Sequence, residues 1–500
     1  MFRLTTLALL LASTAATADQ FSIKASATVA SAADTLVLLV SPEQLNANPQ
    51  LEAISKQENF KAAHGATLTW LAPSSPYSQY QRVVLLGTGD TVKLTPYQAS
   101  LLGATAARAL KGSAASSIQL DASLINPPFS QSELLAQLSH GVDLASYTFT
   151  RYHSDKKPET VRQLHLLSNE QSAAEQRLAQ LAALSEGVKL ARDLTNEPAN
   201  GIYPETFAKQ ALELRKLGAK VTVMDEKALE KAGLGAIIAV GRGSARPPRM
   251  VIVQWEGSKQ QPLAIVGKGV TFDTGGYNLK TQADSILRMT SDMAGAAAVL
   301  GTMHTLAKQK APVNVVALIP LAENMISDRA YLPGDVVTAG NGKTIEIINT
   351  DAEGRMLLAD ALWYAEQNFK PRAIVDIATL TGAKVGAVGS YYAGLFSKDD
   401  ALVAQLNKAG DTVNEKVWRL PLSDEMLPEL KSRIADLRNT GSSTGASTAA
   451  LFLQQFVENT PFAHLDIAGN ALSNSNRGLH TEGGTGYGVR LLTEWVLTAE

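Results

Sequence analysis

The 500-residue sequence contains no cysteine. This absence excludes disulfide bonds, thiolate zinc sites, iron–sulfur clusters and a cysteine nucleophile. Histidine is also sparse: seven are present, and none has the H-E-x-x-H spacing or another paired spacing, so we assign no histidine to a metal site. Any metal ion must therefore be bound by oxygen ligands or by nitrogen ligands other than these.

The chain also lacks a charge excess of either sign. Its 45 Lys and Arg residues oppose 47 Asp and Glu residues, which gives a formal net charge of −2. This balance implies no polyanion partner, and we expect no binding to nucleic acid. The sequence has no G-x-S-x-G elbow, Walker loop or G-x-G-x-x-G loop, so serine hydrolases and nucleotide-binding proteins are not indicated. With 45% hydrophobic and 18% charged residues, disorder, coiled coil and collagen are excluded.

No stretch approaches the roughly 20 uninterrupted apolar residues of a membrane span, so we expect no membrane association. The N-terminus carries Arg3, an apolar run over residues 7–12 and the small-residue tripeptide Ala16-Thr17-Ala18. This pattern is typical of a secretory signal peptide over residues 1–18, although an ordinary core helix is the alternative. We therefore expect a periplasmic or secreted protein, and the absence of cysteine excludes a lipoprotein anchor.

Short apolar runs rich in β-branched residues alternate with longer helical patterns, which predicts an α/β fold with two domains. The smaller N-terminal α/β domain is expected over residues 19–172, a connecting helix over 173–196, and a larger C-terminal α/β domain over 197–500, with a central mixed sheet flanked by helices. Predicted strands are 35–40, 67–72, 82–87, 117–120 and 163–167 in the first domain, and 220–224, 250–254, 263–266, 314–318, 344–348 and 373–377 in the second.

Two segments of the larger domain concentrate charged residues after predicted strands, where open α/β sheets place their ligand crevice. The segment after strand 263–266 holds Lys268, Asp273, Lys280 and Asp292, and the segment after strand 344–348 holds Asp351, Glu353 and Arg355. Four carboxylates that converge on one crevice would repel one another unless a cation lay between them. A hard divalent cation suits such a group.

Local alternatives stay open for individual residues. Asp351 and Glu353 precede a predicted helix over 356–366, where they would also be favoured as helix-capping and first-turn residues. Lys268 lies between two glycines, and its amine is either a deprotonated metal ligand or base, or the partner of a carboxylate in a salt bridge. Lys280 is suited to remain charged and to stabilise an oxyanion.

The string NTDAEGR at 349–355 resembles the leucyl aminopeptidase (cytosol aminopeptidase) family of dinuclear metal exopeptidases. The resemblance extends from about residue 194 to residue 492. The blocks that carry it are LTNEPAN at 194–200, VGRGSARPP at 240–248, VGKGVTFDTGG at 266–276, AENM at 322–325, PGDVV at 333–337, DIATLTGA at 376–383, HLDIAG at 464–469 and TGYGVR at 485–490.

The resemblance implies two divalent metal ions per subunit, Mn or Zn, and a set of ligands. Lys268, Asp273, Asp292 and Glu353 would bind one ion, and Asp273, Asp351 and Glu353 the other. It also implies that Lys280 and Arg355 are the catalytic side chains, Lys280 holding the developing oxyanion and Arg355 holding a bicarbonate that moves a proton.

For the substrate, the resemblance implies a peptide with a free α-amino group and a homohexameric enzyme. The residues implied to bind the substrate are Lys280, Met289, Asn349, Thr379, Leu380, Thr381, Gly382 and Ala468. Met289 and Ala468 would shape an apolar pocket for a leucine-like first side chain, although plain core packing is the alternative for Met289. The loop over 277–290 departs from the family pattern: the stretch from Lys280 to Asp292 is one residue longer than usual.

The predicted function is that of a metal-dependent aminopeptidase, which hydrolyses N-terminal, preferably Leu-like, residues from peptides through a two-metal-activated water. The alternatives are an exported family member with altered specificity, such as a dipeptidase, and a non-catalytic peptide-binding protein. A Mg²⁺ phosphatase would share the strand-end aspartates, but an amine ligand at Lys268 suits Zn²⁺ or Mn²⁺ better. A DNA-binding accessory role is disfavoured by the near-zero net charge.

Overall fold

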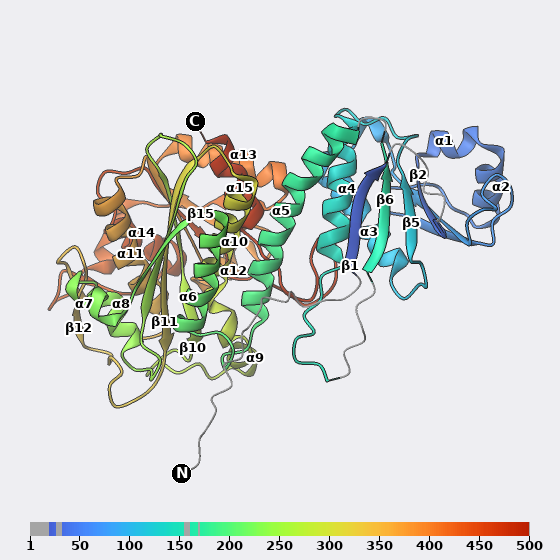
Figure 1. Cartoon of the computed structure of the whole chain (residues 1–500). Helices are drawn as coiled ribbons and strands as arrows, with labels where there is room; N and C mark the ends of the chain where they lie inside the picture. Colours follow the sequence, from blue (N-terminus) through green and yellow to red (C-terminus); the bar gives the residue numbers. More distant parts are fainter. Residues whose placement is uncertain (1–19, 27–32, 155–160, 169–170, 500) are drawn as a thin grey trace, which may run out of the picture.

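The computed structural model describes residues 20–26, 33–154, 161–168 and 171–499, which form two large sheets with their covering helices and two small sheets (Figure 1). The predicted signal peptide lies outside the described residues. Within the described part of the chain, no helix combines the length and apolar character required to cross a bilayer. The predicted α/β class with a mixed sheet in the larger, C-terminal part is confirmed.

The N-terminal sheet has the strand order β1-β6-β5-β2-β4-β3, and only the pairing of β3 with β4 is antiparallel. Along β2, Val37 and Leu39 pack with helices α3 and α4, whereas Leu36 and Leu38 face the side of α1 and α2. Because both faces are buried, this strand is apolar throughout instead of alternating. The elements are β1 (Gln20–Ser26), β2 (Thr35–Val40), α1 (Pro42–Ala47), α2 (Pro49–Gln57), β3 (Thr67–Leu71), β4 (Arg82–Gly87), α3 (Pro96–Leu110), β5 (Ser117–Asp121), α4 (Gln131–Ala145) and β6 (Val161–Leu167).

The long helix α5 (Gln171–Asn196) runs between the two sheets (Figure 1). Its fully buried Arg192 donates hydrogen bonds to the carbonyl oxygens of Leu144, Leu479 and Thr485, at 2.7, 2.8 and 3.1 Å. The first acceptor belongs to α4 and the other two to the C-terminal loop before α15 (Val489–Thr498). One guanidinium therefore ties the N-terminal helices to the end of the chain.

The second sheet has the order β16-β15-β18-β14-β9-β11-β8-β7, and β10 pairs in parallel with β11. Its centre, β18-β14-β9-β11, is parallel, and the outer pairings of β15 with β18 and of β7 and β8 are antiparallel. The strands are β7 (Lys220–Met224), β8 (Arg249–Glu256), β9 (Leu263–Gly267), β10 (Gly269–Asp273), β11 (Asn314–Asn324), β14 (Ala373–Ala378), β15 (Ala393–Ser397), β16 (Val417–Arg419) and β18 (Phe462–Asp466).

Helices cover both faces of this sheet. One apolar core joins it to α5, α6 (Pro204–Leu212), α10 (Ala294–Gln309), α13 (Asp400–Val413) and α15. The core on the other face joins it to α7 (Glu226–Lys231), α8 (Gly235–Gly241), α11 (Glu353–Phe369) and α14 (Gly445–Gln454). The short helices α9 (Ala283–Leu287) and α12 (Gly382–Val388) follow β10 and β14.

One strand lies elsewhere than expected. The predicted strand 344–348 is β13 (Thr344–Glu346), which belongs to a separate small sheet with β12 (Val336–Thr338) and β17 (Leu437–Arg438). The segment 349–355 therefore does not leave the central sheet; it connects this small sheet to α11. The helix begins at Glu353, three residues before the predicted start at 356.

A buried carboxylate holds α11 in place. Asp360 is fully buried and accepts hydrogen bonds from the backbone N–H groups of Ala236 (2.8 Å), Ile237 (3.0 Å) and Gly340 (2.7 Å). The first two are otherwise unpaired donors at the start of α8. Burial raises the pKa of Asp360 to about 7, although these three N–H groups act to lower it.

We predict that Asp360→Ala lowers the free energy of unfolding by about 3 kcal/mol, because three N–H groups, two of them buried, lose their acceptor. Urea denaturation followed by circular dichroism measures the loss. Asp225→Ala is the control: Asp225 caps α7 by accepting from Ala228 N at an exposed position, and its loss should cost about 1 kcal/mol. Equal effects of the two substitutions would contradict the anchoring role of Asp360.

Candidate metal centre and active site

Parallel strands bring the charged residues of the larger domain to one edge. Lys268 follows β9, Asp273 ends β10, and Thr379 follows β14. Because β9, β10, β11 and β14 run in the same direction, their carboxyl ends meet at this edge. Glu353 reaches the same place from the first turn of α11.

Lys268 occupies the centre of one half of the site. Its buried Nζ lies 2.7 Å from Asp292 Oδ2 and 3.0 Å from Glu353 Oε1, and it donates a hydrogen bond to the carbonyl oxygen of Thr379 at 2.8 Å. Thr379 also donates from Oγ1 to Asp292 Oδ1 at 2.7 Å. The Lys268 amine is thus surrounded by oxygen atoms. Its contacts with the protein are those of a salt bridge with two carboxylates, which was one of the two alternatives for this residue.

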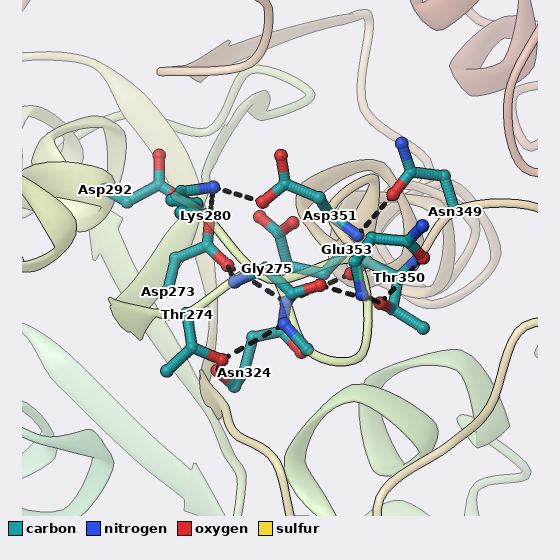
Figure 2. A network of polar contacts seen from close by, with 12 residues as sticks. Asp273, Thr274, Gly275, Lys280, Asp292, Asn324, Asn349, Thr350, Asp351 and Glu353 are labelled. Carbon is teal, nitrogen blue, oxygen red and sulfur yellow. Dashed lines mark hydrogen bonds and ion pairs between the residues drawn. The ribbon is translucent and has the colours of Figure 1, made fainter. Parts of the chain in front are cut away.

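Asp273 lies at the centre of the other half (Figure 2). Its Oδ2 is 2.5 Å from Lys280 Nζ, and Lys280 also pairs with Asp351 Oδ1. Its Oδ1 accepts hydrogen bonds from Gly275 N and from Asn324 Nδ2, both at 2.9 Å. Figure 2 shows the carboxylates of Asp273, Asp292, Asp351 and Glu353 facing a common region, with Lys280 among them.

The donor set fits a divalent cation. Asp273, Asp292 and Glu353 each offer an oxygen atom, and these atoms lie within 4.8 Å of one another. Glu353 is 1% exposed, yet its Oε2 forms no hydrogen bond with any residue that the structure describes. A buried carboxylate oxygen without a donor is costly unless a cation binds it, and carboxylate with amine ligands suits Zn²⁺ or Mn²⁺.

The protonation of these groups reflects their crowding. Burial, followed by the charge of Asp273, raises the pKa of Glu353 to about 8, and burial raises that of Asp292 to about 6. Burial would lower the pKa of Lys268, but Asp292, Glu353 and Asp273 together outweigh it and raise the pKa above its ordinary value. Among protein groups alone Lys268 therefore keeps its proton, and a bound cation would have to displace that proton.

Glycines make this close approach possible. Gly275 has a φ of 85°, and a Cβ atom there would lie 2.4 Å from Asn278 O and 2.8 Å from Asp351 Oδ1. A Cβ at Gly354 would lie 2.4 Å from Lys268 Cε. Any larger residue at either position would push the lysine or the aspartate out of the cluster.

Arg355 belongs to the same helix turn but not to the carboxylate cluster. Its Nη1 donates to the carbonyl oxygen of Asn439 at 2.8 Å, and its Nε has no hydrogen-bond partner among the described residues. Burial lowers the pKa of Arg355 to about 10, against the charges of Glu353 and Asp466. Nearby, Asn349 Oδ1 accepts from Asp351 N at 2.8 Å and so shapes the turn that carries Asp351.

Five of the residues implied to bind substrate lie on two neighbouring segments. Thr379, Leu380 and Thr381 connect β14 to α12, Gly382 is the first residue of α12, and Ala468 follows β18. Asp466 links the segments by accepting from Leu380 N (3.1 Å), Ala468 N (3.0 Å) and Thr381 Oγ1 (2.7 Å). Met289 is buried at the start of a 3₁₀ turn, Met289–Met293, that also carries Asp292.

Three polar residues that organise the site were given no role on sequence grounds. Asn324 positions Asp273, Asp466 positions the 379–382 loop, and Asn439 accepts from the N–H groups of Ile348 and Asn349. Asn324 ends a strand that was predicted only as far as 318. A prediction that extended this strand to residue 324 would have placed Asn324 at the same edge of the sheet as the charged residues.

Comparison with known proteins places this geometry in a family. The model of the cytosol aminopeptidase family catalytic domain matches residues 189–493, and that of the family's N-terminal domain matches residues 29–156. A probable cytosol aminopeptidase 1 of Shewanella oneidensis is 48% identical, with 93% of each chain covered, and a probable cytosol aminopeptidase of Sinorhizobium fredii is 44% identical, with 92% covered. Among solved structures, the bottromycin maturation enzyme BotP in complex with Mn is 34% identical with a TM-score of 0.84, covering 93% of this chain and 99% of that one.

The same comparison contradicts the expected periplasmic or secreted location. The relatives that match most of this chain are named cytosol aminopeptidases. The prediction of export depended only on the residue pattern of the first 20 positions. The match to the relatives depends instead on most of the chain.

The cluster of carboxylates, the two family models and the two relatives lead to one assignment: the chain belongs to the cytosol aminopeptidase (leucyl aminopeptidase) family and is a metal-dependent aminopeptidase, a hydrolase.

Proposed function

We propose that this aminopeptidase removes leucine-like residues from the free N-terminus of peptides by means of two divalent metal ions. The observation that carries this proposal is the group of Asp273, Asp292 and Glu353, whose oxygen atoms lie within 4.8 Å of one another beside the buried amine of Lys268. Carboxylates buried this close together repel one another, and bound cations would offset that repulsion.

The ligands would be divided between two ions that share residues. Lys268, Asp273, Asp292 and Glu353 would hold one ion, and Asp273, Asp351 and Glu353 the other. Both are Mn or Zn in this proposal, which is supported by the amine in the donor set and by the Mn complex of the structural neighbour BotP. When bound, the ions supply Lewis-acid polarisation and an activated water.

Two cationic side chains would complete the site. Lys280 is held by Asp273 and Asp351 at the edge of the cluster, where its ammonium can donate to the scissile carbonyl oxygen as negative charge develops there. Arg355 lies deeper and has a buried Nε without a partner among the described residues. We propose that it holds a bicarbonate that carries a proton from water to the leaving amine.

The substrate would lie along residues 379–382, with Asn349 at one end. Met289 and Ala468 would border the apolar pocket for its first side chain. We further propose that the enzyme is a homohexamer, as the family resemblance of the sequence implies. Its proposed location is the cytosol, as the names of the relatives suggest. The proposed domain boundaries are 19–172, 173–196 and 197–500.

Glu353→Gln should bind less metal and lose activity. The substitution replaces a shared anionic ligand by a neutral amide. Loss of a residue that only supports a metal ligand typically lowers metal affinity or activity by about 10–100-fold. For a ligand itself we expect kcat/KM to fall by more than about 100-fold. Metal content by mass spectrometry and hydrolysis of leucine p-nitroanilide measure both effects. Glu205→Gln, at an exposed position of α6, is the control, and full turnover by a folded Glu353→Gln protein would overturn the proposed centre.

Lys280→Met should separate catalysis from metal binding. Removal of one preorganised donor at a developing oxyanion costs about 100–1,000-fold in kcat. Metal content should stay at the wild-type level, since Lys280 is not a proposed ligand. A variant that loses its metal together with its activity would show that Lys280 supports the ligands instead of the substrate.

Metal removal should reversibly abolish activity, and only toward free amines. We expect the chelated protein to be inactive on leucine p-nitroanilide and to regain activity with Mn²⁺ or Zn²⁺, whereas N-acetyl-leucine p-nitroanilide resists cleavage in every state. Cleavage of the acetylated substrate would contradict exopeptidase selectivity. Binding without cleavage by the folded, metal-loaded protein would instead favour a peptide-binding role.

A further inference from the structure

Helix α12 carries a lysine whose ammonium group is enclosed by the protein. Lys384 is 0% exposed. Its Nζ donates hydrogen bonds to the carbonyl oxygens of Gly389 (2.9 Å) and Ala468 (2.8 Å) and to Asn470 Oδ1. An ammonium has three donors and no acceptor, so these three oxygen atoms satisfy it completely. None of them is a carboxylate, which is unusual for a buried lysine.

Lys384 and Asp466 connect the same two segments, the 379–382 loop and the residues around Ala468. Asp466 accepts hydrogen bonds from both segments, whereas Lys384 donates to both. Its own backbone N–H donates to Thr381 Oγ1 at 3.0 Å, at the start of α12. Asp466 holds the N–H of Leu380 and that of Ala468. The carbonyl oxygen of Ala468 then accepts from Lys384, so that this residue is fixed through both of its backbone polar groups.

We infer that Lys384 is a positioning residue that fixes the distance between the 379–382 loop and Ala468, and thereby sets the selectivity for the substrate's first side chain. This inference rests on the proposed function, which places the first side chain between these segments. Lys384 touches neither metal ligand nor reacting atom in the described structure. Its effect should therefore fall on substrate choice and not on the chemical step.

The protonation of Lys384 adds a dependence on pH. Burial lowers its pKa to about 8, against the opposing charge of Asp466. A neutral amine has two N–H groups and a lone pair, and the lone pair would face one of the three oxygen atoms. Loss of the proton therefore breaks one of the three links.

Few other charges act on this group. Helix α12 has no second charged residue, and α14 and β15, which pack against it, carry no titratable side chain. Strand β18 presents Asp466 and His464, and His464 is paired with the buried Asp376. We expect the Lys384 contacts to loosen as the pH rises through about 8.

The test is the ratio of kcat/KM for leucine p-nitroanilide to that for alanine p-nitroanilide, measured on the metal-loaded protein from about pH 6.5 to about pH 9.5. Both substrates carry the same kind of α-amino group, with a pKa of about 8, so its titration largely cancels in the ratio. In the wild type the ratio should fall as the pH rises through about 8. In Lys384→Met it should be about tenfold lower at neutral pH, as expected for a loosened apolar pocket, and independent of pH.

The change should appear in KM for the leucine substrate, with kcat for the alanine substrate and the metal content unchanged. Lys408→Met, at an exposed position of α13, is the control and should match the wild type. A wild-type ratio and pH profile in folded Lys384→Met would overturn the inference.

A second variant covers the case in which Lys384→Met fails to fold. Asn470→Asp places a carboxylate beside Nζ and raises the pKa of Lys384, so the fall of the ratio should move to higher pH. An unchanged midpoint would overturn the inference. If the wild-type protein cleaves neither substrate, the proposed function itself fails, and this is established before any variant is compared.

Discussion

Electrostatic compensation among buried carboxylates is the constraint on which the site depends. Asp273 and Glu353 are buried and Asp292 is half-buried, and the three lie close enough to share one cation. Burial, and then the negative charge of Asp273, raise the pKa values of Asp292 and Glu353, so the site would take up protons if nothing else neutralised it. Among the protein groups, Lys268 and Lys280 supply positive charge. In the proposed two-metal centre the ions would supply it instead at Lys268, which would bind as a neutral amine.

The need to bring these charged groups close together explains the glycines and the neutral hydrogen-bond donors around the site. The glycines at 275 and 354 leave room for Asp351 and for the Lys268 side chain where a Cβ atom would collide with them. The neutral donors Asn324 and Gly275 hold one oxygen of Asp273 and leave the other for a cation. The scaffold therefore fixes the ligands by backbone and amide groups, which add no charge of their own.

Much of the fold was accessible from the sequence because its strands are short, apolar and well separated. The predicted strands 35–40, 82–87 and 220–224 coincide with β2, β4 and β7. Periodicity does not reveal which sheet a strand joins, and the strand over 344–348 was therefore placed in the wrong sheet. The tertiary pairing of β13 with β12 and β17 decides that question.

The same division applies to the site. Charged residues after strands were conspicuous, so Lys268, Asp273, Asp292, Asp351 and Glu353 could be named, and the structure brings them together. Neutral or isolated polar residues were not conspicuous: Asn324, Asn439 and Asp466 act through backbone groups that lie far away in the sequence. In the sequence Lys384 resembles any lysine on a helix, and only the structure shows that it is buried.

The loop over 379–382 joins the two halves of the site. Thr379 accepts from Lys268 and donates to Asp292, both proposed metal ligands, whereas Leu380 and Thr381 bind Asp466. The metal centre and the substrate pocket thus share one short backbone segment between β14 and α12. Because that segment is held by hydrogen bonds at both ends, the position of the substrate relative to the metal ions follows from the same contacts that hold the ligands. Lys384 contacts this segment through its backbone N–H and contacts Ala468 through its side chain, without touching a proposed metal ligand, so a change there should alter selectivity separately from catalysis.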